Sequence, residues 1–216
     1  MIVMNNKILQ KFKNVAVIPV IEIDSVIDAV PLAHALLEGG IDLIEITLRS
    51  SNSLKCAKEI IKKVKGISVG VGTLINVDQV QSVIDVGVDF AFSPGCNPKV
   101  INKSEQKNLM FIPGVSSPTE IEIAHDNGCN ILKYFHSESY GGLNHLKNIS
   151  KPYNHLNLKF IPTGGINLSN YSSYIRSDIV LAVGSSWIAP KKIIKSKNWN
   201  LITSNATNFL NKIKKI

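Results

Sequence analysis

Short apolar runs alternate with amphipathic stretches along the whole chain, and this alternation restricts the possible folds more than any other feature. The apolar runs occupy residues 15–21, 41–48, 67–72, 89–93, 109–113, 130–135, 158–162 and 179–183. Several of them end in Gly, Pro, Ser or Thr, and helical patterns follow, such as the apolar residues at positions 26, 30, 33 and 37. Strand–helix alternation at this regular spacing is typical of parallel βαβ units.

Eight such units predict a closed (β/α)8 barrel, the TIM-barrel fold, over residues 1–216 as one domain. A chain of 216 residues with 44% hydrophobic content can bury the core of such a domain. Residues 1–13 contain no signal-peptide apolar block, and they predict a short amphipathic helix before the first strand. An open, doubly wound sheet is the alternative fold. That fold is associated with a nucleotide fingerprint, and neither GxGxxG nor a Walker A motif occurs in the sequence.

The bulk composition restricts the partners and the compartment. A net charge of +8 would suit a nucleic-acid partner, but the lysines are scattered and no recognition motif accompanies them. No apolar run is long enough to span a bilayer. The three cysteines lack CxxC spacing, which favours a reducing compartment. We therefore expect a soluble cytoplasmic protein that binds neither nucleic acid nor membranes and has a modest attraction for anionic substrates.

Polar side chains occur in the second predicted strand, where a core strand should have few. Because side chains alternate along a strand, Glu45, Thr47 and Arg49 point to the face opposite Ile44 and Ile46. The chain has two arginines against 22 lysines, so an arginine at this strand end favours planar, bidentate recognition of a carboxylate or phosphate. A structural Glu–Arg pair explains the stripe equally well. In TIM barrels the chemistry takes place at the carboxyl ends of the strands, which is where these residues lie.

Lys133 lies in the second half of the apolar run 130–135, which is the sixth predicted strand. Desolvation favours the neutral form of a lysine, and a neutral amine attacks a ketone to form a Schiff base. Glu45 can supply the proton transfers of such a reaction, while Arg49 and Thr73 can hold the carboxylate of a keto acid. The alternative for Lys133 is a side chain that extends to the barrel rim. Lys159 lies early in its own strand, and we expect it to have no catalytic role.

The last two predicted strands end in glycine-containing segments that are suited to phosphate binding. These segments are Pro162-Thr163-Gly164-Gly165 and Gly184-Ser185-Ser186. TIM barrels commonly bind phosphate with backbone N–H groups from these two loops. Gly164 and Gly165 would allow a close approach to the backbone, and Ser186 would add a hydroxyl. A tight turn without a ligand is a plausible alternative for one loop, and a less plausible one for two loops at the expected positions.

Together these segments resemble the Schiff-base (class I) aldolases of 2-keto-3-deoxy-6-phosphogluconate (KDPG), which often also cleave 4-hydroxy-2-oxoglutarate (KHG). The resemblance covers nearly the whole chain, and the matching segments are 17–21, 39–41, 44–49, 72–73, 93–95, 113–115, 118–120, 132–135, 141–142, 162–165 and 184–187. The galactonate branch of the family typically has Pro and Asn where this chain has Thr47 and Arg49, which favours the gluconate substrate.

The resemblance implies a role for each matching site residue. Lys133 would form the Schiff base, and Glu45 would act as the general acid/base, through a water molecule. The implied substrate contacts are Arg49 and Thr73 for the carboxylate, Gly164, Gly165 and Ser186 for the phosphate, and Pro94, Phe135 and Thr163 elsewhere along the substrate. The resemblance also implies keto-acid and phosphosugar substrates, a homotrimer, and neither a metal ion nor an organic cofactor.

The sequence departs from the family pattern in two places. His136 and Ser137 stand where the family usually has Pro and Ala, and Ser185 replaces a common glycine. His136 could change the mouth of the site, although a solvent-facing replacement without a chemical role is slightly favoured. The alternatives to the KDPG reading are a phosphogalactonate-type aldolase, a metal-dependent aldolase and a non-catalytic phosphosugar-binding barrel.

Overall fold

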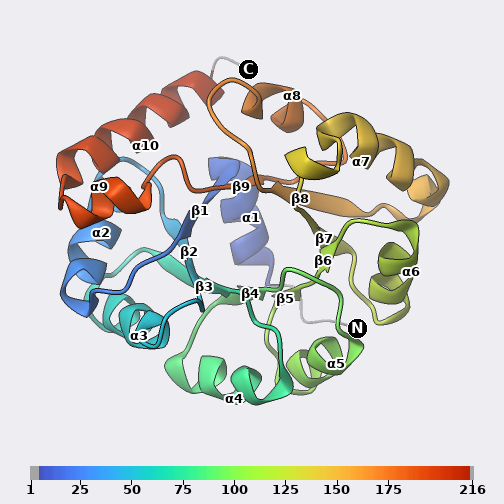
Figure 1. Ribbon diagram of the computed structural model, residues 1–216, viewed down its shortest axis with the longest axis horizontal. Coiled ribbons are helices and arrows are strands. Elements are labelled where there is room, and N and C mark those ends of the chain that lie inside the picture. The colour runs from blue at the N-terminus through green and yellow to red at the C-terminus, as the bar shows by residue number, and fades with distance from the viewer. Residues whose placement is uncertain (1–4, 215–216) are drawn as a thin grey trace.

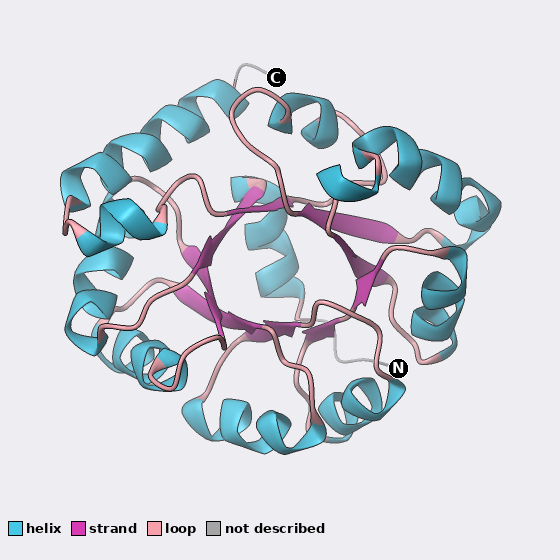
Figure 2. Cartoon of the chain, in the orientation of Figure 1, coloured by secondary structure: helices cyan, strands magenta, loops and turns pink. Residues whose placement is uncertain are grey.

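A computed structural model describes residues 5–214, in which nine parallel strands form a nearly closed barrel inside a ring of helices (Figure 1). The strands are β1 (Val17–Ile21), β2 (Leu43–Thr47), β3 (Ser68–Gly72), β4 (Phe90–Phe92), β5 (Phe111–Ile112), β6 (Gly114–Val115), β7 (Ile131–Phe135), β8 (Lys159–Thr163) and β9 (Val183–Ser185). Figure 2 shows the strands as the inner ring and most helices outside it. The predicted (β/α)8 barrel is confirmed.

The ninth strand arises because one of the eight predicted strands is divided in two. The sheet order is β5-β4-β3-β2-β1-β9-β8-β7-β6. The two edge strands of the sheet, β5 and β6, are therefore consecutive pieces of one segment of the chain. Ala91 of β4 pairs with Phe111 in β5, and Gly114 of β6 pairs with Lys133 in β7. Pro113 separates the two pieces, and it has no backbone N–H to donate to a ladder. The segment 111–115 therefore closes the barrel between β4 and β7.

The helices follow the strands as the amphipathic patterns predict. They are α1 (Asn6–Val15), α2 (Val26–Glu38), α3 (Ser53–Lys63), α4 (Val77–Val86), α5 (Pro98–Gln106), α6 (Pro118–Asp126), α7 (Gly142–Ser150), α8 (Tyr171–Ile175), α9 (Lys191–Lys195) and α10 (Trp199–Ile213), with the 3-10 helices η1 (Glu138–Tyr140) and η2 (Lys151–Leu156). Capping boxes start α4 at Asn76 and α6 at Ser117, where side chain and backbone satisfy each other's hydrogen bonds. No helix in the described part of the chain is long and apolar enough to cross a membrane.

Helix α1 lies across one end of the barrel, where it is visible through the ring of strands (Figure 1). Phe12 is fully buried, and its ring centroid lies 5.1 Å from that of Phe90 and 6.3 Å from that of Phe92. Lys11 joins the same helix to the start of β2 through Asp42, with 2.8 Å between the charged atoms. The amphipathic helix expected over residues 1–13 is thus found from Asn6 onward, and positions 1–4 lie outside the described residues.

The last strand begins later than the apolar run predicted. The run at 179–183 contributes an isolated bridge between Val180 and Phe160, and β9 itself starts at Val183. β9 pairs with β1 through Val17, Ile18 and Pro19 and with β8 through Thr163. Ser185 therefore lies within the last strand, and Ser186 follows immediately after it.

Candidate active site

Lys133 and Glu45 form a buried ion pair inside the barrel. Each is the middle residue of its strand, Lys133 in β7 and Glu45 in β2. Nζ of Lys133 donates a hydrogen bond to Oε1 of Glu45 at 3.2 Å, and the two residues are 5% and 1% exposed. Because β2 and β7 are not neighbours in the sheet, the closure of the barrel brings the two side chains together. Glu45 thus pairs with Lys133, and not with Arg49 as the structural Glu–Arg alternative required.

A glycine and two aromatic rings shape the space around this pair. A Cβ atom on Gly72 of β3 would lie 1.9 Å from Oε1 of Glu45, so the carboxylate occupies room that only glycine leaves. The ammonium of Lys133 lies 5.0 Å from the ring centroid of Phe92 and 5.4 Å from that of Phe135. Aromatic faces attract a cation and exclude water from it. The pair is therefore enclosed but can exchange a proton directly.

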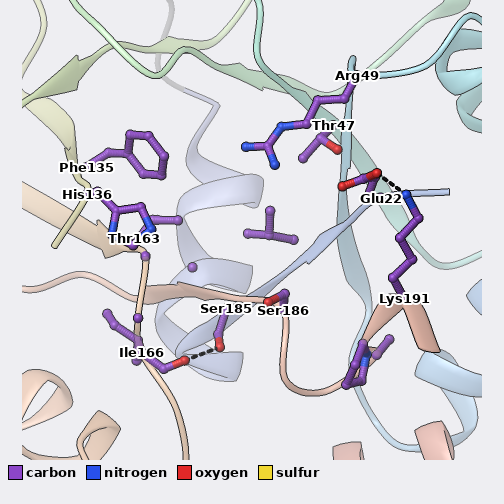
Figure 3. Close-up of a pocket in the computed structure, with 16 residues that line it drawn as sticks. Glu22, Thr47, Arg49, Phe135, His136, Thr163, Ile166, Ser185, Ser186 and Lys191 are labelled. Carbon is purple, nitrogen blue, oxygen red and sulfur yellow. Dashed lines mark hydrogen bonds and ion pairs between the residues drawn. The ribbon is translucent and has the colours of Figure 1, made fainter. Parts of the chain in front are cut away.

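A cavity of about 490 Å³ lies at the carboxyl ends of the strands, and neither Lys133 nor Glu45 belongs to its lining. Its lining includes Thr47 of β2 and Phe135 of β7, each two positions beyond Glu45 or Lys133 along its strand. Side chains two positions apart in a strand share a face, so the cavity and the ion pair are stacked layers of one barrel interior. In Figure 3, Phe135 and His136 face the cavity from one side, and Glu22 and Lys191 lie on the other.

Arg49 and Thr47 lie on one rim of this cavity (Figure 3). β2 ends at Thr47, and Arg49 follows in the loop, where its side chain is exposed. Oγ1 of Thr47 donates a hydrogen bond to the carbonyl of Ile21 at 3.0 Å, which fixes that side chain. Within residues 5–214, the guanidinium of Arg49 has no hydrogen-bond or ion-pair partner. It is therefore free to bind a planar anion with two donors.

Thr163, Gly164, Gly165 and Ser186 lie together on the opposite rim. Gly164 and Gly165 have φ angles of 102° and 77°, in the region that favours glycine. A Cβ on Gly164 would come within 2.6 Å of the imidazole of His136, which shows how closely that ring covers the loop. The exposed backbone and the Ser186 hydroxyl provide neutral donors that suit an anion.

Two of the three residues that depart from the family pattern, Ser185 and Ser137, have a structural explanation. Ser185 is 4% exposed, and its Oγ donates a hydrogen bond to the carbonyl of Ile166 at 2.6 Å, so the hydroxyl ties β9 to the loop after β8. Ser137 is fully buried, and its Oγ lies 2.8 Å from the hydroxyl of Tyr174. Tyr174 also donates to Glu138, and burial, together with this carboxylate, raises the pKa of the phenol. These hydroxyls join loops at the rim of the cavity.

The third departure, His136, lines the cavity and is half-buried. Its Nδ1 lies 3.1 Å from Oγ of Ser139, and its ring centroid lies 5.0 Å from that of Phe135. The ring covers Gly164 at the cavity wall, so His136 forms part of the mouth of the site, and the expectation that it has no chemical role stays a prediction.

Thr73 and Pro94 do not line the cavity. Thr73 follows β3 directly, with a positive φ of 65°, and Pro94 is exposed in the loop after β4. The carbonyl of Pro94 packs against Gly114, where a Cβ would lie 2.2 Å from that oxygen. Burial raises the pKa of Cys96 in the same loop to about 11, so the thiol is protonated and does not act as a nucleophile at neutral pH.

Glu22 and Lys191 are cavity residues that the sequence analysis did not identify. Glu22 follows the first apolar run directly, so its position at a strand end was a usable signal. Lys191 lies in a lysine-rich run next to the last strand, where one lysine could not be distinguished from the next. In the described part of the chain, no group of three or more His, Cys, Asp or Glu residues is arranged to hold a metal ion.

Comparison with known proteins places this geometry among sugar-acid aldolases. The family model described as KDPG and KHG aldolase matches residues 8–205. A 2-dehydro-3-deoxy-phosphogluconate aldolase of Treponema pallidum is 36% identical over 197 residues, which are 91% of this chain and 93% of the relative. A KHG/KDPG aldolase of Escherichia coli K12 is 34% identical over 187 residues, which are 87% of each chain.

A solved structure shares both the fold and much of the sequence. It is KDPG aldolase from Legionella pneumophila with pyruvate captured at low pH as a covalent carbinolamine intermediate. Its TM-score to this chain is 0.89, with 38% sequence identity over 93% of this chain and 97% of that chain.

Proposed function

The chain belongs to the KDPG and KHG aldolase family, and from this membership we propose that Lys133 is the lysine that forms a Schiff base with the substrate. The enzyme is a carbon–carbon lyase that cleaves KDPG, also named 2-dehydro-3-deoxy-6-phosphogluconate, into pyruvate and glyceraldehyde 3-phosphate. The covalent carbinolamine of pyruvate in the Legionella pneumophila relative supports a lysine-based route. The observation that carries the assignment to Lys133 is its buried position 3.2 Å from Glu45.

The proposed reaction starts with proton transfer within the ion pair. Glu45 takes a proton from Lys133, and the neutral amine attacks the keto carbon of KDPG, C2, to give a carbinolamine. Glu45 returns the proton to the carbinolamine oxygen, which leaves as water, and an iminium remains. The carboxylate, directly or through a water molecule, then takes the proton of the C4 hydroxyl. The C3–C4 bond breaks, its electrons reduce the iminium to an enamine, and glyceraldehyde 3-phosphate is released.

The second half of the cycle regenerates the free amine of Lys133. The enamine is protonated at C3, and water attacks the resulting pyruvate iminium to free pyruvate and the amine of Lys133. One carboxylate at hydrogen-bonding distance is sufficient for these steps because each moves one proton at a time. Phe92 and Phe135 surround the reacting nitrogen and keep bulk water away from it.

The two ends of the substrate would occupy opposite rims of the cavity. Arg49 binds the carboxylate of KDPG. The family resemblance assigns Thr73 to the same carboxylate, although Thr73 does not line the cavity. Gly164, Gly165 and Ser186 bind the phosphate, and Thr163 and Phe135 line the space between. KHG, which has no phosphate, would use the same carboxylate site as a second substrate. The resemblance also supports a cytoplasmic homotrimer of one-domain subunits, and light scattering after gel filtration tests the trimer.

Borohydride trapping tests the lysine assignment. The enzyme is incubated with pyruvate, reduced with sodium borohydride, digested and mapped by mass spectrometry. The reduced adduct is expected on Lys133 and is expected to disappear in a Lys133→Ala variant. Lys159→Ala is the matched control, since Lys159 is exposed at the start of β8 and donates to the carbonyl of Asp178 at 2.7 Å. An adduct on Lys159, or none on wild-type enzyme with pyruvate, would refute the proposal and favour a non-catalytic barrel.

A further inference from the structure

Glu22 and Lys191 form an ion pair on the cavity wall, outside the set of residues that the reaction above uses. Nζ of Lys191 hydrogen-bonds to Oε1 of Glu22, as drawn in Figure 3, and lies 3.8 Å from Oδ2 of Asp24. The side chains of Glu22 and Lys191 are 36% and 43% exposed, and both line the cavity. The hydrogen bond to Glu22 raises the pKa of Lys191, so this lysine is a cation.

The sheet order places Glu22 between the two proposed binding rims. β1 lies between β2, which leads to Arg49, and β9, which leads to Ser186. Ile21 is paired with Ile46, so Glu22 follows in register beside Thr47, and Pro19 is paired with Ser185. Figure 3 shows the same arrangement, with Glu22 between Arg49 and Ser186. A substrate that spans both rims must pass Glu22 with its central carbons.

The carboxylate of Glu22 is suited to bind a hydroxyl group of the substrate. A carboxylate has only acceptors, so it repels the carboxylate and phosphate ends of the substrate but accepts a hydrogen bond from a hydroxyl. KDPG has hydroxyls at C4 and C5, and the C4 hydroxyl must face Glu45 for cleavage. The C5 hydroxyl, between the breaking bond and the phosphate, is left for Glu22.

We propose that Glu22 determines substrate specificity by accepting a hydrogen bond from the C5 hydroxyl of KDPG, and that Lys191 is the positioning residue that holds the Glu22 carboxylate in place. The inference rests on the proposed function, because it uses the assigned rims. Lys191 also neutralises Glu22, which makes a carboxylate compatible with a substrate that carries two anionic groups. After cleavage, C5 of KDPG becomes C2 of glyceraldehyde 3-phosphate, so Glu22 would also bind the C2 hydroxyl of this product.

The reverse of the cleavage reaction, aldol addition, tests this proposal with two acceptor aldehydes. Pyruvate is condensed with glyceraldehyde 3-phosphate or with 3-oxopropyl phosphate, which keeps the aldehyde and phosphate but lacks the hydroxyl. Glu22→Ala is expected to lower kcat/KM about 10- to 100-fold for glyceraldehyde 3-phosphate, the scale of a hydrogen bond to a charged group, and less than about twofold for 3-oxopropyl phosphate. Equal losses with both aldehydes, or no loss with either, would overturn the proposal.

Lysine variants test the positioning role. Lys191→Met is expected to reduce the preference for glyceraldehyde 3-phosphate, and Lys191→Arg to restore it, because the arginine can still pair with Glu22. Lys192→Met is the matched control, since the neighbouring lysine is exposed and does not line the cavity. Failure of Lys191→Arg to restore the preference lost in Lys191→Met would refute positioning by charge pairing.

Pyruvate trapping separates this inference from the proposed function. Glu22→Ala should still give the reduced pyruvate adduct on Lys133, since pyruvate carries no hydroxyl at that position. A normal adduct combined with equal losses for both aldehydes refutes the Glu22 assignment alone. Loss of the adduct in wild-type enzyme refutes the lysine assignment itself.

Discussion

The Lys133–Glu45 pair combines two charges that are expensive to bury separately. Removing a charged group from water costs several kcal/mol in proteins, and a partner at hydrogen-bonding distance offsets part of that cost. The 3.2 Å contact means that neither group has to be left uncompensated in the resting enzyme. A substrate carbonyl that enters this space meets an amine and a carboxylate that are already in position, so little reorganisation is needed before the first proton moves.

Arg49 is the residue whose charge and geometry can be separated by mutation. Arg49→Lys keeps the charge but loses the planar pair of donors, so we expect the substrate carboxylate to be misaligned over Lys133. The expected loss in kcat/KM is about 1.5–3 kcal/mol of transition-state stabilisation, the scale of a hydrogen bond to a charged group. Steady-state kinetics should give similar losses for KDPG and KHG, because both substrates carry the carboxylate. A loss confined to KDPG would make Arg49 a phosphate ligand.

Ser186 lies at the other rim, and its mutation is expected to affect the two substrates unequally. Ser186→Ala removes one neutral donor from the proposed phosphate site, and we expect KDPG cleavage to lose about 0.5–1.5 kcal/mol in kcat/KM. Cleavage of KHG, which lacks the phosphate, should remain nearly unchanged in the same assay. Equal losses for both substrates would indicate that Ser186 acts on the reaction centre or on the fold.

At the scale of elements, β3 supports Glu45 of β2, the proposed acid/base group. The two strands pair from Leu43 with Ser68 to Thr47 with Gly72, which places Gly72 against the carboxylate of Glu45. This contact explains why the strand ends in a glycine although its φ is ordinary for a strand. A side chain at position 72 would have to displace Glu45.

Gly72→Ala should therefore separate folding from catalysis. The new Cβ would lie 1.9 Å from Oε1 of Glu45, so the carboxylate must move away from Lys133. We expect kcat for KDPG to fall about 10²- to 10⁴-fold, the range of general acid–base catalysis, while circular dichroism shows a folded protein. Gly95→Ala is the matched control, because a Cβ at Gly95 meets no atom within 4 Å. Unchanged kcat in Gly72→Ala would argue against Glu45 as the acid/base group.

Strand positions were predictable from the sequence because apolar runs and their breaks are local signals. The run at 41–48 contains β2, and the run at 130–135 contains β7. The run at 179–183 was a poorer guide, since its apolar residues form only a bridge at Val180, and pairing with β1 begins at Val183. Apolar content alone does not determine which residues of a run hydrogen-bond to the neighbouring strands.

At the scale of the whole molecule, barrel closure decides which distant residues meet. Lys133 and Glu45 were predictable one at a time, because each is a charged residue in an apolar strand. Glu22 and Lys191 were missed, because 169 positions separate them and their contact depends on β9 returning beside β1. Thr73 and Pro94, placed by motif resemblance, do not line the cavity.

Helix α1 completes the barrel core from the end opposite the cavity. Phe12 packs against Phe90 and Phe92, so Phe12→Ala would leave a space under β4. We expect a loss of about 3–5 kcal/mol in the free energy of unfolding, measured by urea denaturation followed by circular dichroism. Lys13→Ala, on the exposed face of the same helix, should change the free energy by less than about 0.5 kcal/mol. If Phe12→Ala lowered the free energy of unfolding as little as Lys13→Ala, α1 would not be part of the cooperative core.

The depth of Lys133 has a consequence for the order of events in a catalytic cycle. The lysine lies below the layer of Thr47 and Phe135, and α1 packs across the far end of the barrel. In the proposed mechanism the pyruvate fragment is held covalently on Lys133, while the phosphate-bearing fragment lies nearer the mouth of the cavity. The aldehyde must therefore depart first and pyruvate last, and in synthesis pyruvate must arrive before its partner. In the proposed mechanism, an obligatory order of binding and release follows from the covalent bond between pyruvate and a buried lysine.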